Sequence, residues 1–180
     1  MARAIPGDYK IPVGLRCLSQ EEMQKYKFVD TIGNYSLYYL NVSFNVNYDY
    51  ILGYFKDNTF NKVAKIYFNK IDEFYEVDTI YVSSDMRGQE ISTKLYAYFV
   101  KELNYQILGS DMQRFGARKL WASLSRRSDL TVDIIDVTND KVLEKDVILH
   151  HGDLDEEFDE RVWSYDSDKK HIRLILKDIK

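Results

Sequence analysis

The chain has 180 residues, of which 45% are hydrophobic, and it carries a formal net charge of -4. This length and apolar content favour one domain with a sizeable core, and the mild charge argues against a general nucleic-acid binder. The single cysteine, Cys17, excludes an intrachain disulfide. The sequence shows neither an apolar run of the roughly 20 residues that span a membrane nor the apolar core of a signal peptide. We therefore expect one soluble domain over residues 1–180, in the cytoplasm.

The N-terminal part of the chain begins with residues 1–14, which contain both prolines and predict an extended arm. Ser19 followed three positions later by Glu22 is typical of a capping box, and it predicts a helix over residues 20–28. Alternating apolar and polar residues then predict strands. The predicted strands are residues 35–48, with an irregularity near Asn41, residues 51–55 and residues 62–68.

The middle of the chain reads as strand, turn and helix. Residues 74–82 are rich in β-branched and aromatic residues, which predicts a strand. A turn around Arg87 and Gly88 follows, and apolar residues at helical spacing from Ile91 onward predict a helix. Because the first amides of a helix lack partners, a basic, glycine-containing turn before a helix is a possible anion site.

The C-terminal part predicts a short strand at residues 106–108 and a helix capped by Ser110 or Asp111. Its apolar face is formed by Phe115, Leu120, Trp121 and Leu124. Further predicted elements are strands at 130–137 and 142–149, an acidic solvated stretch at 153–160, and a hairpin of 163–165 with 171–179. Cys17 and the three histidines show no metal-ligand spacing, so we assign no metal. Five cations give the helix and its end a basic surface, for which a solvated face is favoured over a partner or nucleic-acid patch: Arg114, Arg118, Lys119, Arg126 and Arg127.

The segment 80–100 resembles the acyl-CoA signature of the GNAT superfamily of N-acetyltransferases. That signature is a strand ending in valine, a short turn, and Arg/Gln-x-x-Gly-x-Gly/Ala at the start of a helix. Similar residues stand here at Val82, Asp85, Arg87, Gly88, Ile91, Lys94 and Leu95. The resemblance implies a single α+β domain with a mixed, mostly antiparallel sheet of about six or seven strands. The sheet is expected to splay after residues 74–82 and to carry helices on both faces.

The resemblance also implies a site and a co-substrate. Acetyl-CoA would be held by the turn and the helix start, at Val82, Arg87, Gly88, Gln89, Glu90, Ile91 and Ser92. Glu76 would be the base that takes a proton from an amine acceptor, because a carboxylate suits this step when partial burial raises its pKa. Asp78 is expected on the same strand face. The alternative for both carboxylates is an acidic strand edge facing solvent.

Three residues depart from the family pattern. Glu90 stands at the central glycine of the signature, Ser92 at the last Gly/Ala, and Trp121 where many members have a tyrosine that protonates the leaving thiolate. Glu90 would repel the CoA pyrophosphate unless it turned away or paired with Arg87. Two functions therefore stay open: transfer of acetyl from acetyl-CoA to an amine, and a silent GNAT-fold protein that binds a protein partner. The abundance of Asn, Lys and Tyr is compatible with a phage gene and hence with a host cytoplasm.

Overall fold

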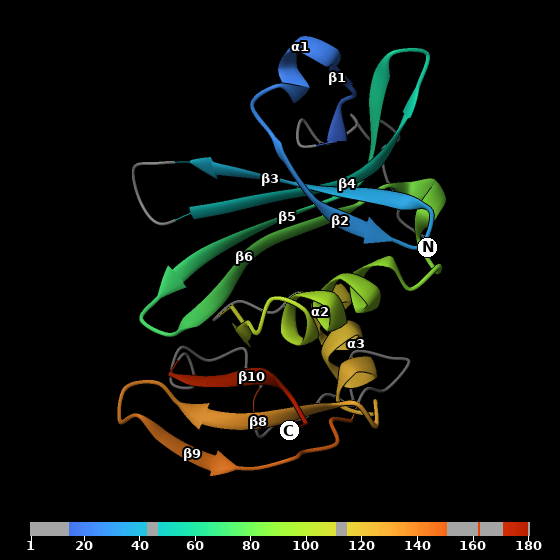
Figure 1. The fold of residues 1–180 in the computed structure, drawn as a ribbon. Coiled ribbons are helices and arrows are strands. Elements are labelled where there is room, and N and C mark those ends of the chain that lie inside the picture. Colours follow the sequence, from blue (N-terminus) through green and yellow to red (C-terminus); the bar gives the residue numbers. More distant parts are fainter. Residues whose placement is uncertain (1–14, 43–46, 111–114, 151–161, 163–170, 180) are drawn as a thin grey trace, which may run out of the picture.

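The computed structural model describes residues 15–42, 47–110, 115–150, 162 and 171–179 (Figure 1). These residues form one sheet of ten strands and three α-helices. The strands are β1 (Leu18–Ser19), β2 (Lys27–Ile32), β3 (Tyr35–Val42), β4 (Asn47–Lys56), β5 (Thr59–Ile71), β6 (Phe74–Val82), β7 (Gln106–Leu108), β8 (Leu130–Asp136), β9 (Lys141–Glu144) and β10 (Ile172–Asp178). The helices are α1 (Gln20–Met23), α2 (Ile91–Lys101) and α3 (Phe115–Leu124).

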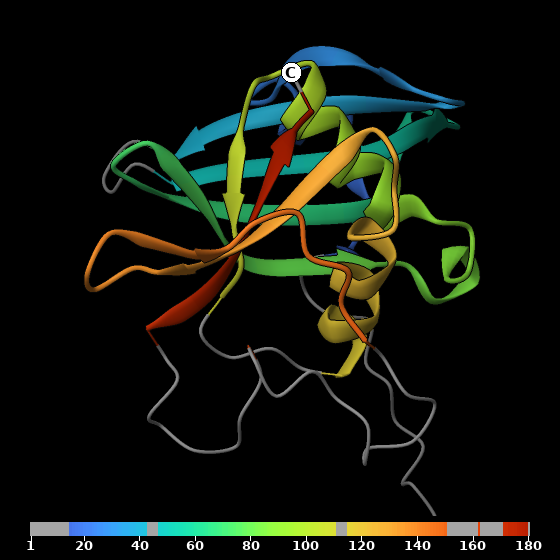
Figure 2. The same cartoon turned by 90° about the horizontal axis from the view of Figure 1, so that it is seen from below.

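The sheet is mixed but mostly antiparallel. Its strand order is β2-β3-β4-β5-β6-β7-β10-β8-β9, and β1 pairs separately with β5. Only the β6–β7 pair is parallel, since every other pairing of these strands is antiparallel. The last strand, β10, lies between β7 and β8, where its red arrow crosses between the yellow-green and orange strands (Figure 2). The predicted α+β class is therefore confirmed, although the sheet has more strands than the expected six or seven.

Two clusters cover opposite faces of the sheet. The main core packs buried residues of α2 and α3 against strands β3–β6 and against β8 and β10. The two helices lie between these two groups of strands (Figure 1). The second cluster places Leu18 and Met23, from β1 and α1, against Ile51 and Phe60. Because side chains alternate along a strand, Ile51 faces α1 while its neighbours Tyr50 and Leu52 face the main core. Apolar side chains are therefore buried on both faces of β4.

The first predicted helix begins where expected but ends early. The Ser19 hydroxyl accepts the Glu22 N–H at 3.2 Å, and the Glu22 carboxylate accepts the Ser19 N–H at 2.9 Å, which confirms the capping box. The helix ends at Met23, however, so the prediction of a helix over 20–28 is wrong beyond its first turn. Residues Lys27–Ile32 pair with β3 instead. Pairing in this hairpin, which turns at Gly33 and Asn34, overrides a local helix preference that is weak in so short a segment.

Two strand predictions also need correction. The single strand expected over residues 35–48 is a hairpin, in which β3 and β4 pair from Ser36↔Gly53 to Val42↔Asn47. Both arms alternate in the same way, so periodicity alone does not reveal the reversal. The strand expected over 142–149 ends at Glu144. The predicted arm at 1–14, the acidic stretch at 153–160 and residues 163–165 lie outside the described residues.

The strands β6 and β7 separate after a short paired stretch. We call the place where they separate, at Glu76 and Leu108, the fork. Their parallel register runs only from Phe74↔Gln106 to Glu76↔Leu108. Beyond Leu108 the chain turns toward β10, where the Gly109 N–H donates to the Leu174 carbonyl at 2.8 Å. The remaining two thirds of β6 pair with β5 alone. The sheet thus opens on one side of β6, between the fork and the turn that follows Val82.

Candidate active site

The turn between β6 and α2 has the predicted strand-to-helix form. After Val82, the Ser83 N–H donates to the Val63 carbonyl of β5 at 2.9 Å. A short 3-10 helix, Ser84–Met86, and four turn residues follow before α2 begins at Ile91. The Ser83 hydroxyl also donates to the Asp85 carboxylate, which fixes the start of the turn. The chain therefore leaves the strand and enters the helix without continuous helix or strand between them.

Two turn residues adopt the left-handed backbone conformation. Gly88 has a φ of 81°, and Glu90, the N-cap of α2, has φ 57° and ψ 23°. This conformation is easy for glycine and costs other residues about 1–2 kcal/mol. The turn therefore keeps a glycine-like backbone at the position where the resemblance expects glycine. The Glu90 side chain makes no capping hydrogen bond and is exposed.

The electrostatic neighbour of Glu90 comes from the end of α3. The Asp129 carboxylate, bonded to Arg127 at 2.7 and 2.8 Å, raises the pKa of the Arg127 guanidinium, and the charge of Glu90 raises this pKa further. Arg87 is exposed, and within the described parts of the chain it forms no ion pair. Glu90 therefore lies in the field of Arg127 and is not paired with Arg87.

The other residues that were predicted to contact acetyl-CoA differ in their exposure to solvent. Ile91 is buried in the main core, whereas Val82 and Ser92 are half-buried. Gln89 is exposed; its side-chain amide donates to the Asp85 carbonyl at 3.4 Å, and its own carbonyl accepts from Lys94 Nζ at 3.3 Å. Lys94 thus brings a positive charge to the start of α2, which favours an anion there.

Glu76 lies at the fork and has a cationic partner. Its Oε1 atom is 2.7 Å from Nη1 of Arg173, a residue of β10, and both side chains are largely buried, at 17% and 13% exposure. The same Nη1 donates to the Gly109 carbonyl at 2.7 Å. Arg173 therefore ties β6, β7 and β10 together where β6 and β7 part. Sequence reasoning missed Arg173, because it is 97 positions from Glu76 and no local motif marks it.

Asp78 is separated from Glu76 by a β-bulge. The register of β5 and β6 passes from Tyr67↔Thr79 to Phe68↔Val77, which leaves Asp78 without a cross-strand partner. A bulge interrupts the regular alternation of side chains. Asp78 is exposed and accepts from the Thr79 hydroxyl at 3.1 Å, whereas Glu76 contacts Arg173. The two-residue spacing of Glu76 and Asp78 therefore does not by itself put their carboxylates on one face of β6.

Trp121 is buried, as predicted from its helix. It is 1% exposed and packs edge-on against Tyr96, with ring centroids 6.1 Å apart. An indole N–H can donate a hydrogen bond but is not an acid comparable to a phenol. Trp121 is therefore a core residue.

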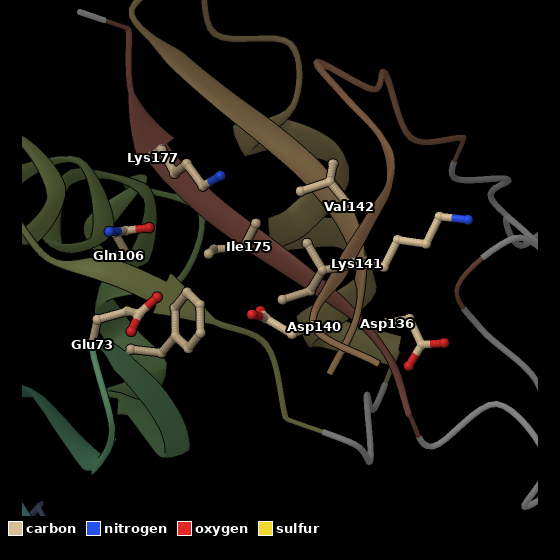
Figure 3. A pocket seen from close by; sticks show the side chains of 10 residues that line it. Glu73, Gln106, Asp136, Asp140, Lys141, Val142, Ile175 and Lys177 are labelled. Atoms are coloured by element: carbon tan, nitrogen blue, oxygen red, sulfur yellow. The ribbon is translucent and has the colours of Figure 1, made fainter. Parts of the chain in front are cut away.

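A shallow depression of about 180 Å³ lies near the other end of β6 (Figure 3). Charged residues including Glu73, Asp140 and Lys141 surround its apolar Phe74 and Ile175. Eight residue steps separate Phe74 from Val82, so the turn is about 26 Å away along the strand. The depression is thus distinct from the turn, although it lies two positions from Glu76 along β6.

Two kinds of site find no support in the described residues. No group of three or more His, Cys, Asp or Glu residues there could hold a metal ion. None of the helices in the described ranges is long and apolar enough to cross a membrane.

Comparison with known proteins gives one distant structural likeness. No protein-family model matches the sequence, and no curated protein matches it significantly. A solved structure of a protein assigned to the GNAT acetyltransferase family, from Bacteroides thetaiotaomicron, is similar at 14% sequence identity and a TM-score of 0.40. The likeness covers 77% of this chain and 65% of that one, slightly less than two thirds of the other protein. Similarity at this level identifies neither a family nor an activity.

Proposed function

We propose that this protein has a GNAT-like fold and is an N-acyltransferase that moves an acetyl group from acetyl-CoA to an amine. The observation that carries the proposal is the geometry of β6. This strand parts from β7 at the fork and ends in a turn with left-handed residues at Gly88 and Glu90. An opened sheet edge offers room for an extended ligand, and a helix start offers amides for its phosphates.

The turn would hold the pyrophosphate of the co-substrate. The first amides of α2 lack intrahelical acceptors, and Arg87 and Lys94 add positive charge at the helix start. Glu90 opposes an anion there, but the field of Arg127 offsets part of its charge. We therefore expect measurable but weak CoA binding by the natural sequence.

The chemical step would take place near the fork. The neutral amine of the acceptor attacks the thioester carbonyl carbon, the C–N bond forms and the C–S bond breaks. Glu76 takes the proton that the amine loses, and solvent protonates the leaving thiolate because Trp121 cannot. A cationic amine entering this region would compete with Arg173 for the Glu76 carboxylate, so Arg173 would have to release it.

Release of free thiol from acetyl-CoA, measured with primary amines such as spermidine or a lysine-containing peptide, tests the transfer. Loss of a general base typically costs 10²–10⁴ in rate, so Glu76→Gln should lower thiol release by at least about a hundredfold with CoA affinity unchanged. Asp78→Asn is the matched control on the same strand and should have little effect. Wild-type protein that binds acetyl-CoA but releases no thiol above the protein-free rate would contradict transfer. That result would favour the alternative function, binding of a protein partner.

A further inference from the structure

Two lysines of β5 are equally buried but differ in their partners. Lys62 is 9% exposed and Lys65 is 8% exposed. Lys65 Nζ is 2.9 Å from the Asp49 carboxylate and 4.3 Å from the centre of the Tyr67 ring. Lys62, by contrast, forms no hydrogen bond or ion pair in the described ranges. Most of the Lys62 side chain is thus buried, although its ammonium group is not among the fully buried atoms, and no carboxylate of the described residues pairs with it.

Both lysines belong to the face of the sheet that α1 covers. The register of β4 and β5 shifts between Ala64↔Leu52 and Lys62↔Gly53, which makes Val63 the extra residue of a bulge. Val63 and Ala64 both pack in the main core. The bulge therefore moves Lys62 to the same side as Lys65, three positions away.

The charges around Lys62 favour its neutral form. Burial, followed by the positive charges of Lys65 and Arg16, lowers the pKa of the Lys62 amine to about 8. The two nearby carboxylates act in the opposite direction but are already engaged, Asp49 by Lys65 and Glu22 by Arg16. Two phenols, Tyr26 and Tyr67, also lie in this group of charges. At pH 7 roughly one Lys62 amine in ten is therefore unprotonated, a far larger share than for an ordinary lysine.

An unprotonated lysine beside other cations is a nucleophile. Desolvation and a cationic neighbour are the two means by which proteins activate lysine, and both act on Lys62. Its neighbour Val63 also accepts the Ser83 N–H at the start of the β6–α2 turn. When Lys62 is protonated, the group has three cations and two carboxylates, and this excess positive charge would attract a negatively charged reagent.

We propose that Lys62 is a site of covalent acylation by acyl donors with an anionic leaving group, such as acyl-CoA thioesters and acyl phosphates. The Lys62 nitrogen attacks the acyl carbon and forms an amide, while the bond from that carbon to sulfur or phosphate oxygen breaks. The amine loses its proton to water, and the leaving group departs as a thiolate or phosphate anion. The product amide removes a buried charge. The reaction needs only a donor in solution, so it does not depend on acyl-CoA binding by the turn.

Peptide mapping of the full chain by mass spectrometry tests this site, after incubation with acetyl-CoA or, separately, with acetyl phosphate at about pH 8. Lys65 is the internal control, because it has the same burial but a carboxylate partner. We expect the initial acetylation rate at Lys62 to exceed that at Lys65 by at least about tenfold with either donor, as the larger neutral fraction requires. The rate at Lys62 should also level off above about pH 8, whereas that of an exposed lysine such as Lys56 keeps rising. Acetylation of Lys62 no faster than that of Lys65, in a sample whose exposed lysines react, overturns the proposal.

Discussion

At the scale of single residues, the contrast between Lys62 and Lys65 has opposite consequences for stability. Removing Lys65 leaves Asp49 buried and uncompensated, a situation that typically costs about 3–5 kcal/mol. The Asp49 Oδ1 atom already has no hydrogen-bond partner among the described groups. Removing Lys62 instead takes away a mostly buried charge that has no partner among the described residues. We therefore expect Lys65→Met to destabilise the protein strongly and Lys62→Met to leave it equally or more stable at pH 7.

The effect of Lys62→Met should depend on pH in a defined direction. The Lys62 amine has a pKa of about 8 in the folded protein, below its ordinary value of 10.5. Between these values the unfolded chain binds more protons, so wild-type stability rises as pH increases through this window. The advantage of Lys62→Met should be largest below pH 8 and should shrink toward pH 10.5. Urea denaturation of both proteins across this range measures it, and an advantage independent of pH would contradict the assignment.

Trp121 is the residue whose burial was predicted and found. Truncation of a buried tryptophan commonly costs about 3–5 kcal/mol, so Trp121→Ala should lose stability in this range. Leu120→Ala is the control on the same helix, because Leu120 is only partly buried against the core, and it should lose less. Equilibrium denaturation distinguishes them. A loss below about 1 kcal/mol for Trp121→Ala would be inconsistent with its packing against Tyr96.

At the scale of elements, the fork depends on the contact between Glu76 and Arg173. Each single substitution, Glu76→Gln or Arg173→Met, leaves a buried group with a lost partner, while the double substitution removes both charges. Contacting residues couple by about 0.5–3 kcal/mol, so the double variant should lose clearly less stability than the two singles added together. A double-mutant cycle from urea denaturation gives this number, with Asp78→Asn in place of Glu76→Gln as the uncoupled control. Additive losses would mean that the two side chains do not interact.

Helices and strands could be predicted where a local sequence pattern was strong and fitted only one kind of structure. The strands at 74–82 and 106–108 and the Ser19 capping box could be located from sequence, because turn and cap residues bound each of them. The extent of α1 and the β3–β4 reversal could not. Lys27–Ile32 form a hairpin with β3, which the capping box at Ser19 does not reveal. One alternating pattern also fits a long strand and a hairpin equally well.

At the scale of the whole molecule, the sequence predicted the class of fold but only half of the candidate site. The turn was predictable because its residues are contiguous. The cations near the two candidate carboxylates, Glu90 and Glu76, could not be predicted. Arg127 follows α3 and Arg173 lies on β10, both far away in the sequence. Arg173 reaches the fork because β10 pairs between β7 and β8, and no local pattern encodes that strand order. Arg127 lies near Glu90 because α3 packs against α2.

We propose that the β6–α2 turn binds acyl-CoA and that Glu90 limits its affinity. Repulsion between a carboxylate and a phosphate 4 Å apart is worth between about 1 kcal/mol in water and about 4 kcal/mol at an effective dielectric constant of 20. Removing Glu90 should therefore tighten binding by between about fivefold and several hundredfold. Glu90→Gln removes the charge alone. Glu90→Gly also removes the energetic cost of holding a non-glycine residue in the left-handed conformation.

Calorimetric titration with acetyl-CoA and with CoA measures this affinity. The wild type, Glu90→Gln and Glu90→Gly are titrated in parallel at low and moderate salt. We predict weak binding by the wild type and tighter binding by Glu90→Gln. Glu90→Gly should bind at least as tightly as Glu90→Gln, with the gain over the wild type reduced at the higher salt concentration. Absence of binding by all three proteins at millimolar ligand would contradict an acyl-CoA site at this turn and exclude acyl transfer from CoA there.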